Sequence, residues 1–128
     1  KRAADVFLEL LDKDADPTVR YWSCLSLGFM KYSKALPVLL AALTTDSSVR
    51  VRKTAAISLR HLSPKTKKAV MIIFDAVTND PEEEVRQTSL QTLQKIAEAQ
   101  GFTSEQDLLK SLGIDLPAQN EATAAEER

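Results

Sequence analysis

The chain has 128 residues, 44% of which are hydrophobic, and its formal net charge at pH 7 is −1. This length suits one ordinary domain, and no apolar run approaches the roughly 18 residues that a membrane span requires. Because Cys24 is the only cysteine, an internal disulfide is excluded, and we expect a reducing, cytoplasmic setting with no membrane attachment.

The apolar residues recur in steps of three and four, which predicts helices that come in pairs. The predicted pairs are 3–12 with 17–31, 34–44 with 48–62, and 66–78 with 82–98. Because the linkers are short, each pair should form an antiparallel hairpin. Asp16 and Asp80 are the expected N-caps of two second helices, and the core of the first pair should include Leu27 and Met30.

A shorter amphipathic helix is predicted over 103–112, where Leu108, Leu109 and Leu112 share one face. We expect this helix to cap the exposed end of the helix stack. The segment 114–128 is rich in Ala, Glu and Gln and has no periodic apolar face, so we expect a disordered acidic tail there.

One signature occurs three times: an Asp, then Val-Arg five residues later, then a Leu eight residues after the Val. The copies are Asp14, Val19-Arg20 and Leu27; Asp46, Val51-Arg52 and Leu59; and Asp80, Val85-Arg86 and Leu93. The copies begin 32 and then 34 residues apart, and four mostly apolar positions precede each Asp. This recurrence indicates a repeat array, whose units must stack to bury their apolar faces.

We therefore predict an all-α solenoid of three stacked helix hairpins with a short C-terminal capping helix. The repeat domain should span 1–113, with repeats at about 3–32, 34–63 and 65–100. Because the first residue is Lys and a helix begins almost at once without a cap, we expect the chain to be an excised piece of a longer one.

The pattern D-x₄-V-R-x₆-L, with an L-x₂-L-L-x₂-L helix before it, resembles HEAT repeats, in particular the short bacterial phycobilisome-lyase HEAT-like repeats. The resemblance covers about 3–98 and implies a right-handed α-solenoid whose second helices line a concave face. It also implies an adaptor or scaffold, although a minority of members join or remove bilin pigments and some bind DNA. The tetratricopeptide repeat fits the length but fails on motif, because Ser26 stands where that repeat has Gly. Ankyrin fails because its T-P-L-H sequence is absent.

The repeated Asp and Arg lie six residues apart, across the turn between the two helices of a pair. The carboxylate can accept backbone N–H groups of the turn, and the guanidinium can form a forked pair with a carboxylate. We expect a structural ladder in which each Arg reaches its own Asp or that of its neighbour. Its predicted members are Asp14, Arg20, Asp46, Arg52, Asp80 and Arg86. The alternative is a binding row made of the three arginines.

The positions two, six and nine residues after the repeated Val are expected to point away from the first helices. In the first copy this set includes Gly28, and Trp22 lies beside it, where either a partner or a preceding repeat would meet the indole. Lys53 and Arg60 are favoured because cations without a pairing role are not needed for stacking. The predicted partner-binding residues are Tyr21, Trp22, Leu25, Lys53, Ile57, Arg60, Gln87, Gln91 and Gln94.

The sequence contains no nucleophile paired with a base, no phosphate-binding loop and no metal-ligand spacing, so we expect no catalytic residue, no cofactor and no metal. We predict a non-catalytic scaffold module that binds another protein or a peptide segment. One alternative is a substrate-positioning part of a bilin lyase-like or other multi-domain enzyme. Another is weak nucleic-acid binding through the basic strip 47–74, which we disfavour because a duplex binder needs a wider basic face.

Overall fold

The computed structural model describes residues 3–115, and all regular structure in that range is helical. The elements are α1 (Ala3–Lys13), α2 (Pro17–Met30), the 3-10 turn η1 (Ser33–Ala35), α3 (Leu36–Thr45), α4 (Val49–Leu62), α5 (Lys67–Asn79), α6 (Glu83–Ala99) and α7 (Glu105–Ser111). Each α-helix begins and ends within two residues of its predicted position. The predicted all-α fold is therefore confirmed, while the expected tail falls mainly on 116–128, outside the described residues.

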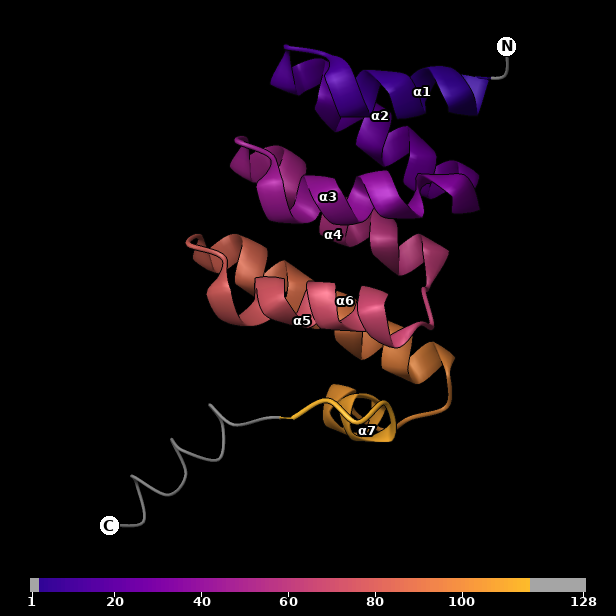
Figure 1. Ribbon diagram of the computed structural model, residues 1–128, viewed down its shortest axis with the longest axis vertical. Coiled ribbons are helices and arrows are strands. Elements are labelled where there is room, and N and C mark those ends of the chain that lie inside the picture. The colour runs from indigo at the N-terminus through magenta and orange to yellow at the C-terminus, as the bar shows by residue number, and fades with distance from the viewer. Residues whose placement is uncertain (1–2, 116–128) are drawn as a thin grey trace.

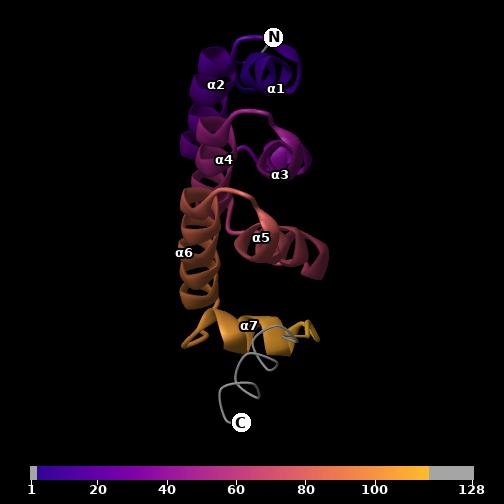
Figure 2. The ribbon, with the colours of Figure 1, turned by 90° about the vertical axis from the view of Figure 1, so that its left-hand side faces the viewer.

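The helices form a stack of three hairpins, α1–α2, α3–α4 and α5–α6, from the N-terminal to the C-terminal end (Figure 1). Seen from the side, α2, α4 and α6 make one layer and α1, α3 and α5 make the other (Figure 2). The short α7 lies across the bottom of the stack (Figure 2). This arrangement is the α-solenoid expected for stacked repeats.

Two of the second helices, α2 and α4, start at a residue whose side chain accepts a free N–H group of the first turn. Asp16 caps α2 by accepting the Thr18 N–H, and Pro17 occupies the first turn, where a missing N–H costs nothing. The expected cap of α6 by Asp80 is wrong, because the helix starts later and its N-cap is Glu82, which makes no side-chain capping bond. Asp80 instead accepts the Glu82 N–H within the turn.

The second helices approach one another closely because small side chains line their contact. Ser58 donates its hydroxyl to the Cys24 carbonyl at 2.8 Å, and Thr92 donates in the same way to the Ala56 carbonyl. A Cβ on Gly28 would lie 2.7 Å from the Ser58 Oγ and 2.9 Å from its Cα. Gly28 is therefore buried where α2 meets α4 and is not part of an open binding face.

The core runs continuously between the two layers. Leu27, Leu59 and Leu93, the last residues of the three repeated signatures, are each fully buried. The expected core position of Met30 is wrong: its side chain is 45% exposed at the end of α2, although Ile96, at the matching position of the third repeat, is buried. Burial is thus not uniform along the array, and the first repeat is the more open one.

Candidate interaction surface

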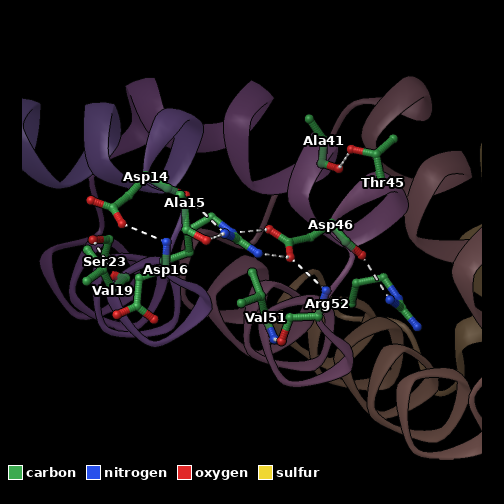
Figure 3. Close-up of polar contacts among 12 residues, drawn as sticks. Asp14, Ala15, Asp16, Val19, Ser23, Ala41, Thr45, Asp46, Val51 and Arg52 are labelled. Atoms are coloured by element: carbon green, nitrogen blue, oxygen red, sulfur yellow. Dashed lines mark hydrogen bonds and ion pairs between the residues drawn. The ribbon is translucent and has the colours of Figure 1, made fainter.

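A row of alternating charges joins the successive repeats at the turns between first and second helices (Figure 3). The Arg20 guanidinium donates from Nε and Nη2 to the two carboxylate oxygens of Asp46, at 2.9 and 3.0 Å. Its Nη1 donates back to the carbonyl of Asp14, at 2.9 Å. Arg52 repeats this arrangement with the Asp80 carboxylate and the Asp46 carbonyl. Arg20 and Arg52 therefore each tie their own turn to the turn of the next repeat.

The paired carboxylates also organise their own turns. Asp46 accepts the Ser48 N–H at 2.9 Å, and Asp80 accepts the Glu82 N–H at the same distance. All four side chains of the two ion pairs are at most 13% exposed, so water competes weakly for these bonds. The hydrogen bond to Asp46 is the main cause that raises the pKa of Arg20 above its ordinary value. These arginines spend their donors inside the protein, which leaves little capacity for a ligand.

The family comparison agrees with this repeated geometry. The family model for HEAT repeats matches residues 1–60 and again residues 39–126. The chain belongs to the HEAT repeat family. No curated protein matches the chain. HEAT repeats commonly act as protein-interaction scaffolds and are typically not enzymes. The finer resemblance to the phycobilisome-lyase type stays a prediction.

The outward side of the second-helix layer, which we call the second-helix face, begins with an aromatic group on α2. The Tyr21 ring meets the Trp22 ring edge-on at a centroid distance of 5.1 Å. The Arg50 guanidinium of the next HEAT repeat lies 3.7 Å from the Tyr21 ring centroid. A cation over an aromatic ring at this distance is attracted by the ring quadrupole. Arg50 therefore belongs to this face, although the sequence analysis did not include it among the site residues.

The same positions of the next two repeats carry an ion pair in place of the cation–aromatic contact. Lys53 Nζ lies 4.0 Å from Glu84 Oε1, and both side chains are substantially exposed. The expectation that Lys53 is an unpaired cation is therefore wrong. The missed residues, Arg50 and Glu84, both stand one residue before the repeated Val. Comparing that position between copies would have found them, because it lies three residues, about one helical turn, before a position of the predicted face.

The remaining predicted residues lie along the same layer without forming one cluster. Leu25 and Ile57 are half-buried, as is Arg60, whose Nε is buried without a hydrogen-bond partner. Gln87 and Gln91 are exposed and Gln94 is half-buried, and Gln87 donates to Glu83 on its own helix at 3.4 Å. The face thus changes along the stack from aromatic and apolar on α2, through basic on α4, to polar and acidic on α6.

The described residues offer few groups suited to metal binding or nucleophilic catalysis. Within 3–115, no group of three or more His, Cys, Asp or Glu side chains is placed to hold a metal ion. Burial raises the pKa of the Cys24 thiol to about 12, so this thiol is a poor nucleophile. No helix in the described part of the chain is long and apolar enough to cross a membrane.

A cavity of about 740 Å³ lies away from the second-helix face. It is an open groove between α5, α6 and α7, with Met71, Phe74 and Leu109 among its lining residues. The side chain of Met71 is 47% exposed there. None of the predicted site residues lines this groove.

Proposed function

We propose that this chain is a non-catalytic HEAT module of a longer protein that holds a partner protein or peptide segment on the second-helix face. The observation that carries the proposal is the juxtaposition of Tyr21 and Trp22 on α2 with Arg50, Lys53 and Arg60 on α4. Aromatic residues and arginine are enriched at the energetic centres of protein interfaces. HEAT-type stacks present extended surfaces suited to such binding.

The charge of the face indicates the chemistry of the partner. Between the aromatic group on α2 and the Gln row on α6, the cations of α4 form the middle of the surface. We infer that the partner segment carries acidic residues over α4 and an apolar or aromatic side chain beside Leu25 and Ile57. We keep the expectation of a cytoplasmic setting, since the single cysteine is a buried thiol.

A charge-reversal experiment tests the assignment. The parent chain, tagged at one end, is used to capture partners from the native cell extract, and the retained proteins are identified by mass spectrometry. The Lys53→Glu, Arg60→Glu double variant should lose the retained partner, because acidic residues would then oppose an acidic segment. Circular dichroism should show unchanged helix content, since Lys53 is substantially exposed and Arg60 is half-buried in the last turn of α4.

A matched control distinguishes this effect from a change in total charge. Lys65 and Lys68 are exposed and precede or begin α5, away from the second-helix face. The Lys65→Glu, Lys68→Glu variant changes the net charge by the same amount and should retain the partner. Equal retention by both variants would reject the face, and equal loss would reduce the effect to net charge.

A further inference from the structure

The outer side of the first repeat differs from the matching sides of the second and third repeats. Three residues after the repeated Val, the chain has Trp22 in the first copy and Thr54 and Thr88 in the later ones. The two threonines are 4% and 7% exposed, whereas the Trp22 side chain is 56% exposed. A bulky aromatic residue is therefore left open at a position that is buried wherever another repeat precedes it.

The hydrogen bonds show which neighbour buries this position. Ser58 stands four residues after Thr54, so both side chains share one side of α4. Ser58 donates to the Cys24 carbonyl on α2, which means that this side of α4 faces the preceding repeat. Thr88 and Thr92 have the same relation on α6, where Thr92 donates to the Ala56 carbonyl. Trp22 therefore points to where a preceding repeat would lie.

The first helices show the same difference. Leu10 is half-buried, whereas its counterparts Ala42 and Ala76 are 7% and 4% exposed. Val6, on the same helix, is 41% exposed. Val6 and Trp22 are thus two of the exposed large hydrophobic residues within 3–115, and both lie on this side of the first repeat. Phe29, also exposed, lies on the other side, where its ring meets His61 of the second repeat.

The charge row ends unpaired on the same side. The carboxylates of Asp46 and Asp80 each accept two bonds from the arginine of the preceding repeat. The Asp14 carboxylate accepts the Asp16 N–H of its own turn and, among the described residues, forms no ion pair. The exposed apolar residues and the Asp14 carboxylate without an arginine thus match the two kinds of contact, apolar packing and ion pairing, that join the repeats inside the stack.

We propose that this surface, the end face, docks a further HEAT-type helix hairpin that brings an arginine to Asp14 and a small side chain to Trp22. The end face consists of Ala3, Val6, Leu10, Val19, Trp22 and Ser26. The occupant would stack in the register of the two internal junctions, since the same positions meet the same kinds of groups. The end face shares Trp22 with the second-helix face, but Tyr21 and the cations of α4 lie outside it. Failure of this contact would therefore leave the proposed function untouched.

A second copy of this chain is a poorer occupant. Its own last arginine of the row is Arg86, which donates to the Asp80 carbonyl and has no carboxylate partner among the described residues. The end of the stack that bears Arg86 is covered by α7, whose Leu108 and Leu109 are each 1% exposed. A copy would have to displace this helix to present Arg86 in the register of the internal junctions.

The experiment attaches a hairpin of known sequence to the whole chain. A copy of residues 1–32 is fused in front of residue 1, so that the repeat spacing of 32 residues is kept. The copy carries Trp22→Thr, which leaves the native Trp22 as the only indole, and it retains Arg20 to meet Asp14. We expect a severalfold lower acrylamide quenching of Trp22, a blue-shifted emission and added helix by circular dichroism.

A matched fusion tests the register. Arg20→Met in the copy keeps an aliphatic side chain but removes the guanidinium that would pair with Asp14. This change should lower the melting temperature of the fusion, while its helix content stays above that of the parent. An added segment that folds without shielding Trp22, or that gains no helix, would overturn the proposal. So would a parent chain whose Trp22 becomes shielded as its concentration rises, because that result assigns the end face to a second copy.

Discussion

The outer surface of the terminal repeat is covered at one end of the stack and exposed at the other. At the C-terminal end, α7 lies across the third hairpin, and Leu93, Ile96, Leu108 and Leu109 are at most 1% exposed. At the N-terminal end, Trp22 is 56% exposed although its counterparts are buried. A repeat cannot bury both of its sides alone, so each end needs either a cap or a neighbour. The described structure supplies a cap at one end only.

The polar groups follow the same contrast. Asp46, between the first and second repeats, accepts bonds from Arg20 and from its own turn. Asp14 has the same place in its repeat but, within residues 3–115, accepts only from its own turn. The same aspartate of the repeat therefore contributes differently to the free energy of unfolding, depending on whether a repeat precedes it.

Removing the cap should have the largest effect. The Leu108→Ala, Leu109→Ala double variant takes two buried leucines from α7 and should lower the free energy of unfolding by about 4–6 kcal/mol, at a few kcal/mol for each buried leucine. Urea unfolding followed by circular dichroism measures the loss. A loss below about 1 kcal/mol would mean that α7 is not a cap, and the contrast between the ends would fail.

The two aspartates form a matched pair for the next test. Asp46→Ala should lower the free energy of unfolding by about 2–3 kcal/mol, because Arg20 is left partly buried without its carboxylate. Asp14→Ala should lower it by less than about 1 kcal/mol, because it removes only one bond within an exposed turn. Chemical denaturation of both variants compares them. Equal losses would show that the charge row does not join the repeats.

The buried thiol of the first junction predicts a pH dependence. The pKa of Cys24 rises from about 9.0 to about 12 on folding, so its stabilising effect is complete below pH 9. Above pH 9 the unfolded chain loses this proton and the folded chain does not, so stability falls as the pH rises toward about 12. Between pH of about 8 and about 10 the parent should lose about 1.4 kcal/mol more than Cys24→Ala. Identical pH profiles in urea unfolding would contradict the burial of the thiol.

The smallest effect is expected at the open end. Trp22→Thr gives the first repeat the residue type of the later copies and removes a side chain that is largely exposed. The free energy of unfolding should change by less than about 1 kcal/mol, because substitutions at exposed positions usually have small effects. Thermal melting measures this change. A large loss would show that Trp22 already packs within the isolated chain.

Much of the fold was predictable from the sequence because the determinants of a helix are local. The spacing of apolar residues, the turns between the helices and the threefold signature placed every α-helix within two residues of its observed bounds. The repetition of Asp and Arg also predicted charges at each turn. Which carboxylate each arginine would take was left open, because two repeats supply equivalent acceptors.

Two of the residues that sequence analysis misplaced, Gly28 and Lys53, depend on the neighbouring repeat. Gly28 shares a helix face with outward residues by spacing, yet α4 approaches so closely that this position is buried. The partners of Tyr21 and Lys53 are Arg50 and Glu84, which come from the next repeat along the stack. A helical wheel gives a direction for each side chain, but it does not give the distance to the next helix.

The sequence by itself determined that the chain is a stack of helix hairpins, since periodic apolar residues fold locally and must be covered by their neighbours. Tertiary structure alone decided which repeat covers which position. The packing of α4 on α2 buries Ser58 and pairs Arg20 with Asp46, while Trp22 meets the Tyr21 ring of its own helix and stays 56% exposed. Identical motifs thus acquire different roles, because burial and hydrogen bonding depend on groups far away in the sequence.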